Sequence, residues 1–382
     1  MEWKEVTISD IANLKNGKKR PSELGVIPVF GGNGIMEYVN SFNSEDTIVI
    51  GRVGAYCGCV YFSKGKCWVS DNAIAAKAKA GNDNEYLYYL LSSLNLNHHH
   101  IGGAQPLMTQ DIIGRIEVVV PQKKDDQRRI ASILSSLDRK IELNNKINAD
   151  LEEMAQAIFK NWFVDFEPFK DGKFVVSELG MIPEGWKVVT LDDLTSKFGT
   201  GLNPRKNFVL GHGNNYYVTI KNMGDNRIYL NDRCDKVDDE ALAKINKRSK
   251  LQKGDLLFSG IGTIGRVAMV VEDPLNWNTS ESVFNMHPID SVSSEFIYLL
   301  LLSDIFQQYV RQNAQGGVQQ GIRMASLKAF QLAIPDDLKF FDNLVKPIIA
   351  KVKSNDREND RLSLLRDTLL PRLMSGELEV PE

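Results

Sequence analysis

Apolar residues recur every seven positions along two long segments, and this spacing predicts two coiled-coil helices. The first helix spans Gln127 to about Phe163, and its seam reads Ile130, Leu137, Asn144, Leu151 and Ile158. The seam of the second helix reads Phe341, Ile348, Asn355, Leu362 and Leu369. Asparagine in the middle of a seam costs stability but fixes the register. Two such helices in equivalent places favour pairing with each other over two separate amphipathic core helices.

The length of the two helices makes them candidate spacers. Roughly 36 residues at ~1.5 Å per residue would reach about 54 Å. Pro347 lies within the second helix and predicts either a kink or a helix start later than residue 338.

Short runs rich in β-branched and aromatic residues, bounded by Gly, Asn or Asp, predict strands in front of each helix. These runs are residues 47–50, 59–62, 116–120, 216–220, 256–259 and 267–271. Residues 86–94 and 295–310 predict helices within the same regions. The fold class predicted is α+β, in which two β-rich regions alternate with two long helices.

The chain repeats itself. Trp3–Ile11 reads WKEVTISDI, and Trp186–Leu194 reads WKVVTLDDL. Further along, Gly102-Gly103-Ala104-Gln105 matches Gly316-Gly317-Val318-Gln319, and the spacing between the two copies then holds without gaps into the long helices. Each half therefore runs from a β-rich segment through a Gly-Gly-x-Gln loop and a proline stop to a long helix. The second half carries about 31 extra residues before its Gly-Gly pair.

The composition narrows the function classes. The chain has 382 residues, 43% hydrophobic and 25% charged, which suits a folded protein of two or three domains. A net charge of −3 excludes a uniformly basic coat for nucleic acid but not a local basic face. Four cysteines, no leader-like start and no apolar run near the ~20 residues of a membrane span predict a cytoplasmic protein without a membrane partner.

Patterns that resemble catalytic or metal sites are weak. Gly260–Gly265 matches the dinucleotide motif G-x-G-x-x-G, but a predicted strand follows it where that motif requires a helix. His98–His100, and Cys57 with Cys59 and Cys67, lack the paired spacing of a zinc site. We find no P-loop, nucleophile elbow, amino-methyltransferase signature or nuclease-like carboxylate cluster, so no catalytic or metal residue and no cofactor is predicted in this chain.

The remaining candidate functional residues are polar side chains in predicted loops. Arg, Lys, Asn and Gln are the side chains that contact base edges and phosphates. The candidates for DNA binding in the first half are Lys18, Lys19, Arg20, Asn33, Arg52, Tyr56, Gln105, Thr109 and Gln110. Those in the second half are Arg205, Lys206, Tyr216, Lys221, Asn222, Arg266, Gln319, Gln320 and Arg323. For any single residue, an ordinary solvated surface is the alternative.

Taken together, these patterns resemble the specificity subunit of type I restriction-modification enzymes. The resemblance rests on the repeated WK opening, Ile27–Ile35, Gly254–Ser259, Pro121 followed by Gln127–Ala131, Leu151–Phe166 and Leu364–Glu377. It covers nearly the whole chain, and its helical motifs are the most specific.

The resemblance implies two target recognition domains, each of which binds one half of a split double-stranded DNA site. It also implies that the two helices pair as an antiparallel coiled coil, set the spacing and dock two methyltransferase subunits. Restriction and translocation subunits would complete a complex with DNA adenine methyltransferase and ATP-dependent endonuclease activities. S-adenosylmethionine, ATP and Mg²⁺ would then belong to the partner subunits, and this chain would be non-catalytic.

The domain boundaries follow from the repeat and the resemblance. We predict recognition domains at residues 1–122 and 185–336, a central helix at 123–165, a linker at 166–184, and a C-terminal helix with its tail at 337–382. Two other hypotheses remain at this point: a methyltransferase or restriction enzyme active on its own, and a coiled-coil adaptor that binds only proteins.

Overall fold

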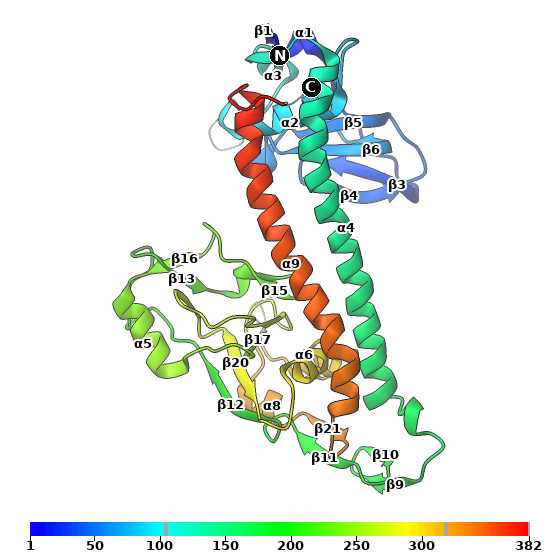
Figure 1. Cartoon of the computed structure of the whole chain (residues 1–382), viewed down its shortest axis with the longest axis vertical. Coiled ribbons are helices and arrows are strands. Elements are labelled where there is room, and N and C mark those ends of the chain that lie inside the picture. The colour runs from blue at the N-terminus through cyan, green and yellow to red at the C-terminus, as the bar shows by residue number, and fades with distance from the viewer. Residues whose placement is uncertain (103–105, 317–319, 381–382) are drawn as a thin grey trace. The chain divides into compact units, whose positions relative to one another are not determined.

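The computed structural model describes residues 1–102, 106–316 and 320–380. The chain divides into two compact units (Figure 1). Each unit has its own hydrophobic core. Unit 1 consists of Met1–Asn144 and Arg357–Glu382, and unit 2 consists of Asn145–Asp356. Each long helix is therefore shared, with part of its length in either unit.

Unit 1 is built on a six-stranded sheet in the order β2-β7-β5-β6-β3-β4. The strands are β2 (Ala12–Asn16), β3 (Leu24–Gly31), β4 (Gly34–Val39), β5 (Ser44–Gly51), β6 (Val60–Val69) and β7 (Ala73–Ala78). All neighbours are antiparallel except β3 and β6. Outside this sheet lie β1 (Trp3–Thr7), β8 (Glu117–Pro121), α1 (Ile8–Ile11), α2 (Asn84–Ser93) and α3 (Gln110–Gly114). The strand β1 pairs with β8, which leads into the long helix α4 (Lys124–Phe163).

Unit 2 divides the corresponding strands between two sheets, β12-β20-β17-β18 and β16-β13-β19. The strands are β12 (Thr195–Thr200), β13 (Asn215–Val218), β16 (Asp235–Val237), β17 (Leu256–Ser259), β18 (Val267–Met269), β19 (Trp277–Thr279) and β20 (Val283–Pro288). As β1 and β8 do in unit 1, β11 (Lys187–Thr190) and β21 (Gln331–Ile334) form an antiparallel pair. The remaining elements are β14 (Met223–Gly224), β15 (Arg227–Ile228), α5 (Asp239–Ser249), α6 (Ser294–Leu302), α7 (Asp304–Asn313), α8 (Met324–Lys328) and α9 (Lys339–Met374).

Corresponding strands pair in the same way in the two units. The parallel pair β3–β6 aligns Phe30 with Val69, and the parallel pair β13–β19 aligns Val218 with Thr279. Ser70 N donates to Phe30 O at 2.9 Å, and Ser280 N donates to Val218 O at 2.8 Å. The sequence repeat is thus a structural repeat.

The helices α4 and α9 pack side by side (Figure 1). Their contacts include polar residues in the middle of the seam. In unit 1, Asn144 Nδ2 donates to Asn359 Oδ1 at 2.9 Å. In unit 2, Asn355 Nδ2 donates to Asn148 Oδ1 at 2.8 Å. The partner numbers fall along α9 as they rise along α4, so the pairing is antiparallel. The predicted fold class, α+β with two β-rich regions and an antiparallel helix pair, is confirmed.

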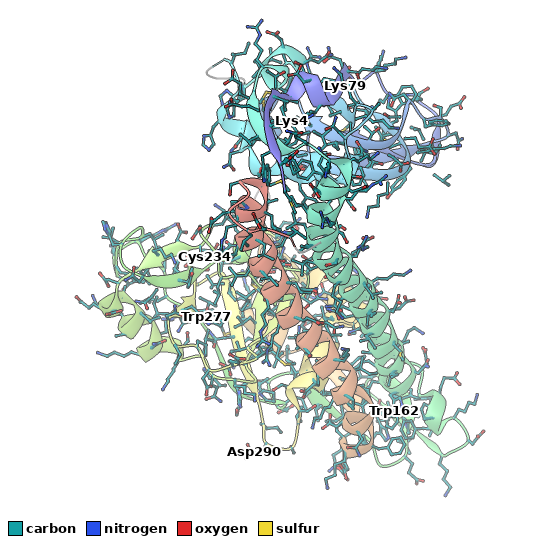
Figure 2. All side chains as sticks on the ribbon, turned by 45° about the horizontal axis from the view of Figure 1, so that its top comes forward. Lys4, Lys79, Trp162, Cys234, Trp277 and Asp290 are labelled. Carbon is teal, nitrogen blue, oxygen red and sulfur yellow. The ribbon has the colours of Figure 1, made fainter. Side chains whose placement is uncertain are left out.

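The C-terminal end of α4 packs into an aromatic cluster of unit 2, where Figure 2 labels Trp162. Phe341 of α9 is fully buried there, and its ring centroid lies 4.8 Å from that of Phe163 and 5.9 Å from that of Phe296. Burial of aromatic side chains of this size supplies a large share of a core's stability.

Several local predictions differ from the structure. Residues 295–310 form two helices, because Ser303 has an extended backbone and its Oγ accepts from Phe306 N. The helix α9 begins at Lys339 and continues through Pro347, so Pro347 does not mark the start of the helix; both Pro347 and Asn343, four residues before it, are exposed to solvent. The linker contains a hairpin, β9 (Phe174–Ser177) and β10 (Gly180–Pro183). The helix α5 and the end of β13 at Val218 were also not predicted.

Candidate nucleic-acid interface

In unit 1 the residues that directly follow the Gly-Gly-x-Gln motif lie beside the glycine-rich loop that follows β5. Gly54 N donates to Pro106 O at 3.1 Å, and Met108 N donates to Arg52 O at 2.8 Å. Gly54 has φ 72°, a left-handed conformation that glycine adopts without strain. Two loops far apart in the sequence are thus joined at one end of the sheet.

Unit 2 has the same arrangement after β17. Gly262 N donates to Gln320 O at 2.8 Å, and Ile322 N donates to Gly260 O at 2.9 Å. The glycines that matched a dinucleotide motif therefore belong to a loop that leads from β17 into the next strand, β18. The same hydrogen-bonded loop pair thus occurs in both units.

Several predicted residues of unit 1 meet at this end of the sheet. Lys18 N donates to Val69 O at 3.0 Å, and Arg52 N donates to Asn72 O at 2.9 Å. The strand β3 ends at Gly31, at this same end of the sheet. Asn33 lies in the turn that follows. Tyr56 is exposed on the glycine-rich loop, and its Cβ lies near the position that a Cβ on Gly32 would occupy. These four residues form one polar surface, which we call loop cluster 1.

Three of the other unit 1 candidates, Arg20, Thr109 and Gln110, have specific structural partners. Arg20 Nη1 lies 3.1 Å from Glu37 Oε1, and Lys19 is exposed on the same loop. Thr109 Oγ1 accepts from Ile112 N at 3.2 Å and caps α3. The Gln110 amide, oriented to satisfy its neighbours, bonds Leu14 O and Asn16 N. Gln105 lies outside the described residues.

In unit 2 the exposed candidates are Arg205, Lys206, Lys221, Gln320 and Arg323. Lys221 lies three residues after Val218, as Asn33 lies three residues after Phe30, so the two occupy corresponding places. Gln320 belongs to the loop pair described above, and Arg323 precedes α8. We call this set loop cluster 2.

Three unit 2 candidates hold the fold locally. Asn222 is buried, and its Oδ1 accepts from Thr219 N at 2.9 Å. Arg266 Nη1 donates to Ile220 O at 2.8 Å and to Met223 O at 2.5 Å. The Tyr216 ring lies 3.2 Å below the Lys236 ammonium. Gln319 lies outside the described residues.

Two further residues near loop cluster 2 were not predicted from the sequence. Glu281 accepts from Asn203 Nδ2 at 2.5 Å, and Tyr217 OH lies 3.3 Å from Glu281 Oε2 while donating to Leu202 O at 2.8 Å. Burial, followed by the Glu281 carboxylate, raises the pKa of Tyr217 well above its usual range. These contacts join the start of the Arg205–Lys206 loop to the sheet, but no sequence spacing indicates them.

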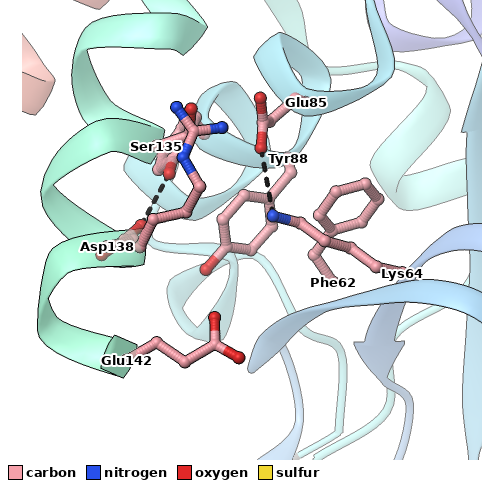
Figure 3. Close-up of a pocket in the computed structure, with 9 residues that line it drawn as sticks. Phe62, Lys64, Glu85, Tyr88, Ser135, Asp138 and Glu142 are labelled. Carbon is pink, nitrogen blue, oxygen red and sulfur yellow. Dashed lines mark hydrogen bonds and ion pairs between the residues drawn. The ribbon is translucent and has the colours of Figure 1, made fainter. Parts of the chain in front are cut away.

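A cavity of about 330 Å³ lies beside α4 in unit 1 (Figure 3). Its lining includes Lys64, whose Nζ lies 3.5 Å from Glu85 Oε1, and Tyr89, whose hydroxyl donates to Asp138 Oδ2 at 2.6 Å. A second cavity, of about 340 Å³, lies between α4 and α6 in unit 2 and includes Glu152 and Tyr298. Tyr88 of α2, which lines the first cavity, and Tyr298 of α6 hold corresponding positions in the repeat.

Among the described residues, no three His, Cys, Asp or Glu side chains gather closely enough to hold a metal ion. Within the same ranges, no helix is both long enough and apolar enough to cross a membrane. The cysteines are free thiols, and Cys57, Cys67 and Cys234 are buried.

The fold thus defines a two-module protein in which each β-rich unit presents a polar loop cluster on a common frame. A family profile described as "Type I restriction modification DNA specificity domain" matches residues 1–153 and 183–354. The chain belongs to this family: it is a DNA specificity subunit of a type I restriction-modification system, the non-catalytic subunit of such a complex.

Individual relatives agree with this assignment. The MjaIX specificity subunit of Methanocaldococcus jannaschii is 29% identical over 315 residues, which are 80% of this chain and 71% of that protein. The HindI specificity subunit of Haemophilus influenzae is 26% identical over 364 residues, 77% of each chain. The crystal structure of a type I specificity subunit from M. genitalium has the same fold, with a TM-score of 0.60 at 17% identity and coverage of 98% of this chain and 96% of that one.

Proposed function

We propose that each loop cluster contacts one half of a split double-stranded DNA site and that α4 and α9 set the distance between the halves. The observation that carries this proposal is the frame shared by the two units. Pro106 and Gln320 accept from the equivalent glycines Gly54 and Gly262, so the same kind of loop pair supports both clusters. Two similar modules on a stiff spacer raise the effective concentration at the second half-site.

The recognition domains in this proposal are residues 1–122 and 185–336, with helical spacers at 123–165 and 337–382 and a linker at 166–184. The terminal strand pairs support these boundaries. In the first domain Trp3 pairs with Pro121, and in the second Lys187 pairs with Ile334. Each pair brings the start and the end of its domain together.

The proposed DNA contacts are few and local, which is compatible with a net charge of −3. We expect Lys18, Lys19, Arg205, Lys206, Lys221 and Arg323 to bind phosphates, because their side chains are exposed. Asn33, Arg52, Tyr56 and Gln320 are candidates for base contacts. Asn222 and Arg266 would then act by holding the loop that carries Lys221.

We further propose that the complex contains two methyltransferase subunits and restriction subunits, which carry S-adenosylmethionine, ATP and Mg²⁺, and that it works in the cytoplasm. The cavities beside Tyr88 and Tyr298 support two similar docking places, one in each unit. Two copies of one partner would suit a chain that repeats its own fold.

The test is methylation mapping in cells that carry this chain with the methyltransferase of its own system. We expect modified bases in two short sequence elements separated by a gap of constant length. Methylation within a single continuous element, or without a sequence preference, would contradict the proposal.

A further inference from the structure

The second unit contains a small hairpin that has no counterpart in the described part of the first. The strands β14 and β15 are joined by Asp225 and Asn226, whose φ values are 46° and 55°. Asp and Asn tolerate this left-handed conformation better than other side chains. At the corresponding place in unit 1, β3 turns directly into β4 through Gly32 and Asn33.

Both long helices hold the turn of this hairpin. Asn226 Nδ2 donates to Glu152 Oε2 of α4 at 3.2 Å, and Lys353 Nζ of α9 donates to Asn226 O at 3.2 Å. The next residue, Arg227, has its Nη1 3.9 Å from Asp356 Oδ1 of α9. One turn is therefore tied to two helices.

The side chains that make these contacts are largely buried. The side chains of Lys353, Asp356 and Arg227 are 12%, 19% and 20% exposed, so water screens their charges less than at an open surface. Burial raises the pKa of Glu152 and lowers the pKa of Lys353. The loss of one partner would leave the other charges with less compensation, which makes the set act as a unit.

The other side of the hairpin leads to loop cluster 2. Arg266 bonds the carbonyls of Ile220 and Met223, and Tyr229 N donates to Asn222 O at 2.8 Å. Lys221 lies between Ile220 and Met223, the two residues whose carbonyls Arg266 holds. A continuous set of contacts therefore joins the helix pair to a residue that we expect at DNA.

We propose that Glu152, Asn226, Arg227, Lys353 and Asp356, here called the hairpin anchor, form a positioning device that fixes the direction of the Lys221 segment relative to the helix pair and thereby restricts the spacer length that the complex accepts. This inference rests on the proposed split-site function.

The physical reason lies in the small step between base pairs. Neighbouring base pairs are ~3.4 Å apart along each strand, so a recognition module that pivots by a few ångströms would accept a spacer that is one pair too long or too short. A helix sets a length only if the module it carries cannot turn on it. The hairpin anchor supplies that restraint in unit 2 from charged side chains on both helices.

The test uses the complex of this chain with its methyltransferase and DNA duplexes that carry both half-sites with the native spacer or with spacers changed by one or two base pairs. The variant Asn226→Gly keeps the positive φ but removes the bond to Glu152, and Lys353→Met keeps the aliphatic stem but removes the ammonium. Lys346→Met is the matched control, because Lys346 lies on the same helix and pairs with Asp342 at an exposed position.

We expect the double variant Asn226→Gly/Lys353→Met to raise methylation at altered spacers, relative to the native spacer, at least tenfold over the unchanged protein. The Lys346→Met control should keep the native profile. An unchanged spacer profile in a double variant with native circular dichroism would overturn the inference. If the double variant does not fold, the spacer profile of the single variant Asn226→Gly is measured instead, and an unchanged profile overturns the inference in the same way.

The two proposals fail in different ways. If the unchanged protein methylates DNA without a preferred spacer, the split-site function is wrong. If it prefers one spacer and the folded variants prefer the same spacer equally strongly, the split-site function stands and the hairpin anchor has only a structural role.

Discussion

The two units share one frame but differ in the segment between the third strand and the central strand. In unit 1, β3 ends at Gly31 and β5 begins at Ser44, with only β4 between them. In unit 2 the corresponding segment runs from Val218 to Leu256 and holds the hairpin β14–β15, the strand β16 and the helix α5. The backbone hydrogen bonds that join the glycine-rich loop to the loop before the long helix are equivalent in the two units. The difference shows that this frame tolerates long insertions, as expected where the ends of an insertion stay close together.

A second difference lies at the start of the long helices. Gln127 of α4 and Phe341 of α9 hold the same place in the repeat. Gln127 is buried and bonds Asp83 N at 2.8 Å and Pro121 O at 3.0 Å. Phe341 is surrounded by aromatic rings. One unit thus joins its helix to the sheet domain by hydrogen bonds, and the other joins it by apolar packing.

The largest predicted effect tests this second difference. Phe341→Ala should lower the free energy of unfolding by about 3–5 kcal/mol, because it opens a cavity among aromatic rings. Gln127→Ala should cost about 1–3 kcal/mol, because it leaves buried polar groups unpaired. Urea unfolding with hydrogen exchange, which assigns each loss to a unit, measures both. Equal losses at the two positions would contradict the contrast between packing and hydrogen bonding.

The next prediction compares the two loop clusters. Lys221→Glu should weaken binding through the second half-site about tenfold and spare the first, while Lys18→Glu should do the reverse, since each removes a cation from one cluster only. Binding to duplexes in which one half-site is scrambled measures each contribution. Arg323→Glu should behave like Lys221→Glu. A variant that weakens both half-sites equally would argue against separate modules.

A smaller effect is expected in the helix seam, where each unit has one asparagine pair. A double-mutant cycle with Asn144→Leu and Asn359→Leu should give a coupling energy of about 1 kcal/mol, because either single change leaves a buried amide with a missing partner. The same cycle at Asn148 and Asn355 should give a similar value. Thermal unfolding of each variant provides the numbers, and additive losses would show that the amides do not depend on each other.

The smallest effect concerns two matched turns. The Thr7 hydroxyl and amide donate to Asp10, and the Thr190 hydroxyl and amide donate to Asp193, so the pKa of each carboxyl is lowered from 3.8. This stabilisation is present above the ordinary pKa and is lost as the pH falls through the lowered value. Asp10→Asn and Asp193→Asn should therefore lower the unfolding temperature slightly and equally at pH 7, with a difference that shrinks in acid. Unfolding curves recorded over a range of pH check this prediction. If the difference in unfolding temperature between the unchanged protein and each variant grew in acid, the ionised carboxylates would not be the source of the stabilisation.

Much of the fold could be predicted from the sequence because its signals are periodic or repeated. The heptads of α4 and α9 and the copies of the WK opening extend over many residues, so local exceptions do not hide them. Ser303 and Pro347 show the limit. A serine cap divides the single helix predicted at residues 295–310 into two helices, whereas a proline on an exposed helix face leaves α9 unbroken.

The candidate site was predicted less completely, because residue type does not distinguish a side chain that faces a ligand from one that holds a loop. Asn222 and Arg266 are the residue types expected at DNA, yet their polar atoms bond the backbone of their own segment. The hairpin anchor could not be predicted either, since Glu152, Asn226 and Lys353 are far apart in the sequence. The run Gly224-Asp225-Asn226 was the local sign of a turn there.

The central claim is that two modules read two half-sites at a distance set by the helix pair. Its most direct test removes one heptad from each helix, residues 141–147 of α4 and the facing residues 357–363 of α9, which leaves the Asn148–Asn355 pair and the bond between Asp138 and Arg366 in place. At ~1.5 Å per residue this shortens the pair by about 10 Å. Methylation mapping should then return the same two half-site sequences with a spacer shorter by up to about three base pairs. The same half-sites at the original spacing would contradict the account.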